Sequence, residues 1–218
     1  MIRKSGPVRN ENRTLQSKYD LTALFYDFLD YYWERQYRQW RPMLTRDVCG
    51  TALEAGVGTG RNLGYYSSDV NLIGIDICFE MLRRAAKRAK SARCTIDLRQ
   101  EDATVMESIP TRHCDWLVST FLCCVMPDDL QPLAIKQFER ILKPGGRFRL
   151  LEMVYSNKPK IRKRQDFFAP IVEKFYGARF DRDTMGHLSS SSKLKILNTF
   201  FLKEDVYVVI EGIKDNES

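Results

Sequence analysis

The sequence predicts an α/β fold with a doubly wound, mostly parallel sheet of seven strands that ends in an antiparallel hairpin. From residue 51 onward, short β-rich runs alternate with helical stretches, and strands separated by crossover helices pair in parallel. The last two β-type runs, residues 194–202 and 206–213, are joined by three residues, which indicates a hairpin. A chain of 218 residues is long enough to cover one such sheet with helices on both faces.

The expected elements follow one another without an internal repeat. Apolar residues at helical spacing over residues 21–32 predict an N-terminal helix, which we expect to end at Arg41-Pro42. The Lys-Pro-Gly-Gly sequence of residues 143–146 predicts a sharp turn before the last parallel strand. Further helices are expected at residues 60–66, 79–89 and 130–142. The parallel strands are expected at residues 51–54, 71–75, 95–99, 116–121 and 147–154.

Composition indicates a globular protein, with 44% hydrophobic and 29% charged residues. No apolar run approaches the roughly 20 residues that span a bilayer, and the basic N-terminus has no apolar segment behind it that would make a secretory signal. We therefore expect a cytoplasmic protein. The six cysteines form no CxxC pair and are expected to be buried free thiols, and no metal site is expected.

The net charge of +7 is unevenly distributed. Basic residues at positions 83–93 lie at helical spacing around apolar ones and predict a solvated helix face. A second basic group, residues 158–164, runs directly into an apolar stretch at residues 167–172. Basic residues beside bulky apolar ones suit a surface that contacts anionic lipid.

A glycine turn follows the first parallel strand. Gly56, Gly58 and Gly60 allow the backbone to turn tightly and leave its N–H groups open to a ligand, at the edge of the sheet where such folds bind. The dinucleotide fingerprint needs a further glycine where this chain has Arg61, so NAD is disfavoured.

Acidic residues end the next two strands. Asp76 is placed to accept hydrogen bonds from both ribose hydroxyls of an adenosine, and Asp102 with the N–H of Ala103 is placed to meet adenine. Each feature also has a structural explanation, because Asp76 could cap the following helix, Asp102 could cap a turn, and the glycines could form only a tight turn. Their joint occurrence at consecutive strand ends favours an adenosine ligand.

These segments resemble the class I S-adenosylmethionine-dependent methyltransferases. The resemblance rests on residues 53–62, 74–76, 80–82 and 142–146. The chain is more narrowly similar to the ubiquinone/menaquinone-biosynthesis and phospholipid N-methyltransferase group, and to related thiol methyltransferases, through residues 19–27, 119–128 and 180–184. The chain departs from that group at Cys78 and Phe79, where serine and proline are usual, and at Met153, where a histidine often follows Glu152.

The resemblance implies a Rossmann-like fold, S-adenosylmethionine as cofactor, and three regions. Residues 1–18 are expected to be a flexible basic N-terminus, residues 19–45 a helical cap, and residues 46–218 the methyltransferase domain with a cap insertion around residues 156–185. The cofactor-binding residues that it implies are Tyr19, Glu54, Gly56, Gly58, Gly60, Asn62, Asp76, Ile77, Met81, Asp102, Ala103 and Ser119.

Methyl transfer from a sulfonium is an in-line displacement with a neutral leaving group, so positioning and exclusion of water are the main tasks. Few catalytic side chains are then needed, and Tyr19, Tyr26 and His187 are the candidates. Tyr19, Tyr26 and Tyr32 could stabilise a cation through their rings, or could only pack the cap.

The acceptor is expected to be a lipid-like or amphiphilic small molecule, such as a phospholipid amine or a quinone, with residues 158–172 at an anionic membrane surface. A small thiol or another soluble metabolite is the alternative, and RNA a more distant one, since no RNA-binding module is recognisable. A non-catalytic scaffold is a third alternative, and DNA is not an expected partner.

Overall fold

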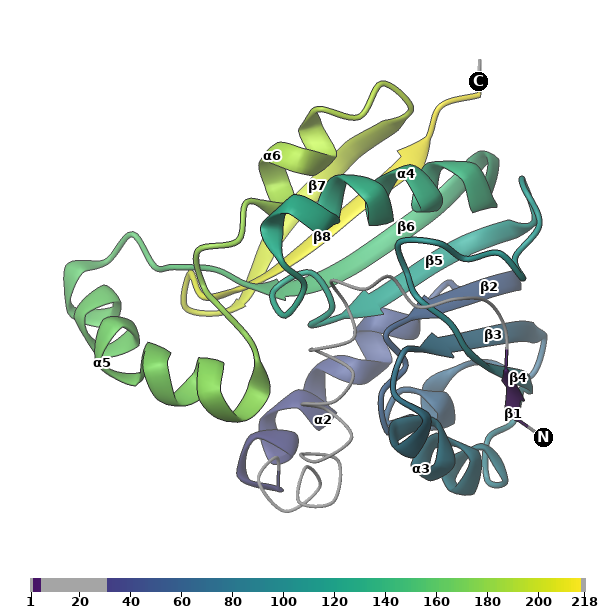
Figure 1. The fold of residues 1–218 in the computed structure, drawn as a ribbon, viewed down its shortest axis with the longest axis horizontal. Coiled ribbons are helices and arrows are strands. Elements are labelled where there is room, and N and C mark those ends of the chain that lie inside the picture. Colours follow the sequence, from purple (N-terminus) through teal and green to yellow (C-terminus); the bar gives the residue numbers. More distant parts are fainter. Residues whose placement is uncertain (1, 5–30, 217–218) are drawn as a thin grey trace.

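A computed structural model describes residues 2–4 and 31–216 of the chain; residues 1, 5–30 and 217–218 lie outside the described part. Its strands form one sheet in the order β1-β4-β3-β2-β5-β6-β8-β7 (Figure 1). The strands are β1 (Ile2–Lys4), β2 (Gly50–Ala55), β3 (Val70–Asp76), β4 (Thr95–Gln100), β5 (Cys114–Thr120), β6 (Leu142–Met153), β7 (Leu194–Lys203) and β8 (Tyr207–Lys214). The helices are α2 (Tyr31–Thr45), α3 (Phe79–Ala89), α4 (Gln131–Ile141), α5 (Pro159–Tyr176) and α6 (Thr184–Ser189), with short 3-10 turns η1 (Leu63–Tyr65) and η2 (Asp128–Leu130).

The predicted fold class is confirmed. Strands β1 to β6 pair in parallel, and β8 pairs antiparallel with both β6 and β7, so the C-terminal hairpin lies at one edge of the sheet. This architecture is doubly wound and Rossmann-like. The carboxyl ends of the parallel strands meet at one side of the sheet, where such folds place their ligands.

Helices cover both faces of the sheet, and the alternation of side chains along the strands explains how. Leu53 and Ala52 are neighbours in β2 and are both fully buried, yet they belong to different apolar cores. Leu53 packs in the core that contains Phe138 of α4, whereas Ala52 packs in the core that contains Leu82 of α3. Because both faces are covered, β2 carries apolar side chains on each side.

Helix α2 packs on the α3 side of the sheet, where its Trp40 and Leu44 contact Leu151 of β6. The prediction that the helix ends at Arg41-Pro42 is wrong, since α2 contains Pro42 and continues to Thr45. Residues 5–30 lie outside the described part, so the start of the predicted N-terminal helix does too.

Arg149 of β6 explains why the helix runs past a proline. Its Nη1 donates to the carbonyl oxygens of Met43, Leu44 and Arg46 at 3.1, 3.0 and 2.8 Å, and its Nε donates to Glu211 at 2.7 Å. The last turn of a helix has carbonyl groups without partners in the helix, and this buried guanidinium satisfies them. Tertiary contacts therefore offset the hydrogen bond that Pro42 removes.

The helix expected at residues 60–66 is also wrong, because only the 3-10 turn Leu63–Tyr65 forms there. Gly60 has a φ of +79°, which a right-handed helix does not accommodate. The neighbouring Asn62 turns its side chain to Glu54 instead of capping a helix.

The N-terminus provides a strand that the sequence did not indicate. Residues 1–18 were expected to be flexible, but Ile2–Lys4 form β1 and pair in parallel with β4. Arg3 also lies 3.4 Å from Asp97 of β4. The sheet therefore has eight strands among the described residues instead of the seven predicted. Three residues are too few to show a β-type alternation.

Helix α5 forms within the expected cap insertion and ends at Gly177, whose φ of +69° suits a helix C-terminus. Figure 1 shows α5 beside the carboxyl ends of the strands and apart from the sheet. Five of the six free cysteines are buried as expected, whereas Cys49 is exposed. Among the described helices, none is long and apolar enough to cross a membrane.

Candidate active site

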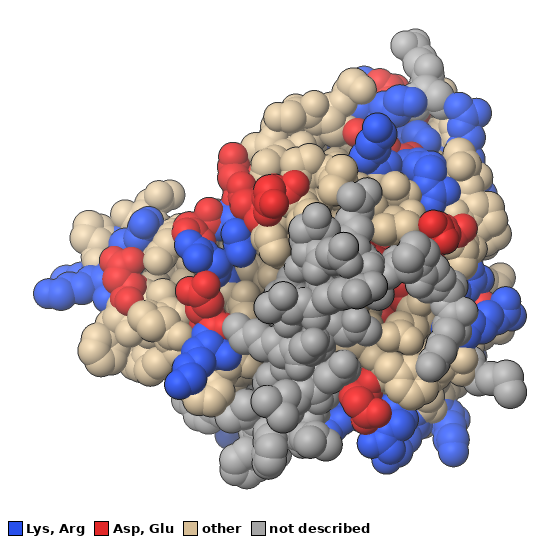
Figure 2. Space-filling view, viewed as in Figure 1, with Lys and Arg blue, Asp and Glu red and all other residues tan. Residues whose placement is uncertain are grey.

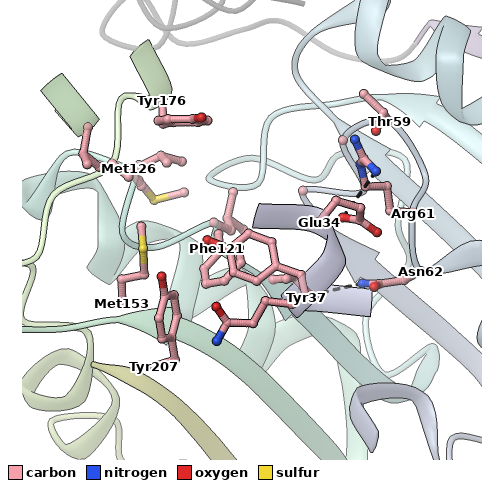
Figure 3. Close-up of a pocket in the computed structure, with 18 of the residues that line it drawn as sticks. Glu34, Tyr37, Thr59, Arg61, Asn62, Phe121, Met126, Met153, Tyr176 and Tyr207 are labelled. Carbon is pink, nitrogen blue, oxygen red and sulfur yellow. Dashed lines mark hydrogen bonds and ion pairs between the residues drawn. The ribbon is translucent and has the colours of Figure 1, made fainter. Parts of the chain in front are cut away.

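A cavity of about 1530 Å³ opens at the carboxyl ends of the strands. Its inner half is lined by the glycine turn and by the ends of β2, β3 and β4, and its outer half by α2, α5 and the segment after β5. Figure 3 shows side chains from both halves, with Asn62 and Arg61 on one side and Met126, Met153 and Tyr176 on the other. The two halves differ in chemistry, because the outer half combines apolar side chains of α5 with basic side chains, whereas the inner half carries the acidic strand ends.

The glycines of the turn have different tasks. Gly58 has a φ of +53°, lines the cavity, and would place an added Cβ no closer than 4.0 Å to a neighbour, the Gly56 carbonyl oxygen. Gly60 does not line the cavity, and an added Cβ there would lie 2.8 Å from the Cα of Ala85 in α3. Gly58 therefore leaves space for a ligand, whereas Gly60 allows close packing of the turn on α3.

Asp76 closes the glycine turn and also faces the cavity. Its Oδ2 accepts a hydrogen bond of 2.8 Å from Gly58 N, and its Oδ1 accepts one of 2.9 Å from Cys78 N at the start of α3. Asp76 therefore caps the turn that precedes α3, but it does not cap the helix, whose N-cap residue is Cys78 and which has no side-chain cap. A carboxylate oxygen has further lone pairs, so the cavity-facing carboxylate can still accept from a ligand.

Asp102 and Ala103 line the cavity where β4 ends. Asp102 is buried, and its Oδ1 accepts from the backbone N and the side-chain hydroxyl of Thr104 at 2.8 and 2.7 Å. The turn-capping role is present here as well. Ile77 and Met81 also line this part of the cavity, so the structure brings together most of the cofactor-binding residues that the resemblance implied.

Glu54 is buried at the end of β2 and lines the same space. Its Oε1 accepts a 2.8 Å hydrogen bond from Asn62, whose own Oδ1 accepts from Arg41 of α2 at 2.5 Å. Its Oε2 is buried and has no partner within hydrogen-bond distance among the described residues; the hydroxyl of buried Tyr66 is also without one. Burial raises the pKa of Glu54 to about 7, although Asn62, the nearby Tyr66 hydroxyl and Arg41 act in the opposite direction.

Glu34 links α2 to the glycine turn through ion pairs with Arg41 and Arg61. Arg41 donates to its carboxylate through Nη2 at 2.6 Å and Nε at 3.1 Å, and Arg61 lies 3.3 Å from it (Figure 3). The sequence alone does not indicate that these three residues belong to the site. The spacing of seven between Glu34 and Arg41 puts them on one helix face, but only the fold brings Arg61 to that face.

Three aromatic rings form a wall between the two halves. The ring centroids of Tyr37, Phe121 and Tyr207 lie 5.0 to 6.1 Å apart, and all three residues line the cavity. Phe121 has a φ of +58°, which is unusual for a residue with a large side chain and directs it from the end of β5. The outer half continues with apolar side chains of α5, namely Ile161, Phe168, Ile171, Val172 and Phe175.

A family model described as a methyltransferase domain matches residues 52–146, which contain the glycine turn and both acidic strand ends. The chain is 35% identical over 99 residues to a phosphatidylethanolamine N-methyltransferase of Cereibacter sphaeroides, over 44% of this chain and 47% of the relative. It is 30% identical over 132 residues to the ubiquinone/menaquinone biosynthesis C-methyltransferase UbiE of Syntrophotalea carbinolica, over 56% of this chain and 53% of the relative. A crystal structure of a SAM-dependent methyltransferase from Methanosarcina mazei has a TM-score of 0.58 at 22% identity, over 76% of this chain and 92% of that one.

Residues 52–146 match a methyltransferase domain, and the chain is similar to class I S-adenosylmethionine-dependent methyltransferases. It spans about half the length of the two curated relatives described above. S-adenosylmethionine is the cofactor of this domain, and the residues present fit it. Asp76 offers acceptors for ribose and Asp102 for adenine, and the unpartnered Oε2 of Glu54 offers one for an ammonium group.

Glu152 has a structural role in the methyltransferase domain. Its two carboxylate oxygens accept from the backbone N–H groups of Cys123 and Cys124 at 2.9 and 2.8 Å. The carboxylate is buried, and burial raises its pKa. Glu152 thereby fixes the segment that carries Phe121 and Met126 into the cavity. The next residue, Met153, also lines the cavity.

Several expected site residues lie elsewhere in the methyltransferase domain. Ser119 is fully buried in β5, and neither it nor Gly60 lines the cavity. His187 lies in α6, 3.2 Å from Asp128, and does not line it either. Tyr19 and Tyr26 lie outside the described residues.

Proposed function

We propose that the chain transfers a methyl group from S-adenosylmethionine to a lipid-like or amphiphilic acceptor, such as a phospholipid amine or a quinone. The observation that carries this proposal is the apolar outer half of the cavity, which continues onto the exposed face of α5. Phe168, Ile171 and Phe175 line the cavity and are also 43% to 49% exposed. A soluble protein rarely leaves such a row uncovered without a ligand or partner for it.

The cofactor supplies an electrophilic methyl group and needs no metal for the transfer. The residues of the inner half would hold the adenosine and ammonium ends of the cofactor, and the aromatic wall lines the same cavity beside them. Tyr37, Phe121 and Tyr207 exclude water at that point, and their ring faces favour a cation beside them. Tyr19 and Tyr26 stay proposed contributors of the same kind.

The size of the cavity leaves room for an acceptor beside the cofactor. At about 1530 Å³ it exceeds the usual volume of a small-molecule site, which is roughly 300 to 1,000 Å³. The relatives named for phosphatidylethanolamine and for ubiquinone/menaquinone biosynthesis act on substrates of this type by name. We propose that residues 158–172 contact an anionic membrane surface at the cytoplasmic side while an apolar chain enters the cavity.

Direct measurement of binding and transfer tests this function. S-adenosylmethionine is expected to raise the melting temperature of the protein. Radiolabelled S-adenosylmethionine is then supplied with phosphatidylethanolamine vesicles, a quinone precursor, a small thiol and RNA in separate reactions. Label in the lipid or quinone fraction supports the proposal. Label only in the thiol or RNA reaction would replace it with one of those activities, and no thermal shift would favour a non-catalytic scaffold.

A further inference from the structure

The outer half of the cavity carries basic side chains that pair with no carboxylate of residues 2–4 and 31–216. Arg35 and Arg38 of α2, Arg164 of α5 and Lys203 of β7 all line it, and none forms an ion pair with a described residue. Lys203 donates a hydrogen bond of 3.0 Å to the neutral side chain of Gln36. Figure 2 shows one face of the molecule, on which basic side chains lie along α5.

The acidic residues of the cavity are engaged elsewhere. Glu204, at the outer rim, pairs with Lys158 at 3.2 Å. Glu34 pairs with Arg41 and Arg61 toward the glycine turn. A ligand in the outer half therefore meets an excess of cations.

Arg164 is exposed to solvent at one side and lines the cavity beside apolar groups of α5. It lies on the same face of α5 as Ile161 and Phe168, three residues before and four residues after it, and all three line the cavity. Tyr207 of the aromatic wall lines the same cavity; burial raises the pKa of its phenol, and the charge of Arg164 acts in the opposite direction. Arg164 thus enters the outer half of the cavity from the α5 side.

The neighbouring basic residues of α5 differ from Arg164. Arg162 lies 3.5 Å from Asp166, and its guanidinium stacks 3.5 Å from the ring centroid of Tyr155. Lys163 is exposed and does not line the cavity. These two residues belong to the outer surface of the helix. Substituting them therefore changes the surface charge of α5 without changing the lining of the cavity, which makes them controls for Arg164.

We propose that the outer half of the cavity is a subsite for an anionic group of the acceptor, and that Arg164 is its specificity-determining residue. A guanidinium presents two parallel N–H donors that match a phosphate or carboxylate, and the apolar side chains of α5 accept the attached alkyl chain. The ligand class is an amphiphile with its anion next to its apolar part. This inference rests on the proposed function and favours a phospholipid amine over a neutral quinone.

Binding of defined amphiphiles tests the subsite without any methyl transfer. Dodecyl phosphate and the uncharged dodecyl maltoside share one alkyl chain, and both are used below their micelle concentration with the full-length protein. Calorimetry is expected to give dodecyl phosphate at least about tenfold tighter binding, which corresponds to one charge-assisted contact. Arg164→Gln is expected to remove this preference, Arg164→Lys to keep part of it, and Lys163→Gln to leave it unchanged.

Two results would overturn the subsite. One is an equal loss in Lys163→Gln and Arg164→Gln, which would assign the preference to surface charge. The other is binding of inorganic phosphate as tight as that of dodecyl phosphate, which would make the ligand a simple anion. Each variant is also checked for its thermal shift with S-adenosylmethionine, which must match that of the wild type. A preserved anion preference without methyl transfer to any lipid would contradict the proposed function and leave the subsite intact.

Discussion

The side-chain amide of Asn62 donates a hydrogen bond of 2.8 Å to the buried carboxylate of Glu54. The same Asn62 accepts from Arg41, so a continuous polar path joins the end of β2 to α2. This path passes beneath the glycine turn and places Glu54 with one satisfied and one unsatisfied oxygen at the cavity. The ionisation of Glu54 therefore bears on both stability and cofactor binding.

We expect Glu54 to make the protein less stable as the pH rises from about 4.5 to about 7. Burial raises the pKa of Glu54 from 4.5 to about 7, so the folded chain binds its proton more tightly than the unfolded chain within this window. The contribution of Glu54 to the free energy of unfolding is most favourable below its unfolded pKa of about 4.5, and it is lost as the pH rises to the folded pKa of about 7. A shift of this size corresponds to about 3 kcal/mol. Urea unfolding between pH 4.5 and 8 should show a shallower pH dependence for Glu54→Gln, and parallel curves for the two proteins would contradict the assignment.

Alanine at Gly58 and at Gly60 should separate binding from stability. Gly60→Ala puts a Cβ 2.8 Å from the Ala85 backbone at a positive φ, so we expect a loss of about 2 kcal/mol or more in unfolding free energy. Gly58→Ala meets no close neighbour, so its stability cost should be only about 1 kcal/mol. Its Cβ would occupy ligand space, however, and calorimetry should show the larger loss of S-adenosylmethionine affinity. Unchanged affinity in Gly58→Ala would mean that the cofactor does not approach this residue.

Glu34→Gln tests the contact between α2 and the glycine turn. The change removes the charge that pairs with Arg41, whose side chain is only 7% exposed, and with Arg61. An uncompensated buried cation is costly, and we expect a loss of about 2 to 3 kcal/mol together with weaker cofactor binding. Glu80→Gln is the matched control, because Glu80 pairs only with exposed Arg83 in α3 and should cost no more than about 0.5 kcal/mol. Equal effects in denaturant unfolding would argue against a specific contact.

Glu152→Gln should destabilise the segment after β5 without changing the binding of the cofactor. A carboxylate accepts from both Cys123 N and Cys124 N, whereas an amide has one oxygen and would set its NH₂ group against one of these donors. We expect about 2 kcal/mol of destabilisation. Hydrogen exchange of the Cys123 and Cys124 amides should become faster, while the thermal shift with S-adenosylmethionine should persist. Slow exchange at both amides would show that other contacts hold this segment.

The sequence predicts the parts of the site that depend on position along a strand. Gly58, Asp76 and Asp102 each follow a strand end, and the parallel order of the strands is enough to bring them to one edge. The strands and helices of the central sheet are predicted because their apolar residues recur at strand or helix spacing. In this part of the chain, the elements that the local sequence favours are the ones that the fold contains.

The remaining features depend on contacts between distant residues. Helix α2 runs past Pro42 because Arg149, more than one hundred residues later, satisfies its last carbonyls. The Glu34–Arg61 ion pair likewise exists only after α2 has packed on the turn. The three-residue β1 has no pattern of its own and is formed by pairing with β4. None of these three features has a pattern in the neighbouring sequence from which it could be predicted.

The hydrogen bonds from Cys123 and Cys124 to Glu152 also affect the order in which the two halves of the cavity can form. The contact from Gly58 to Asp76 closes a loop of 18 residues, whereas the contacts of Cys123 and Cys124 with Glu152 close loops of 29 and 28 residues and need β6 in place. During synthesis from the N-terminus, the nucleotide-facing half is complete in sequence well before the acceptor-facing half has its support. We therefore expect the outer half to be the last part of the cavity to become ordered.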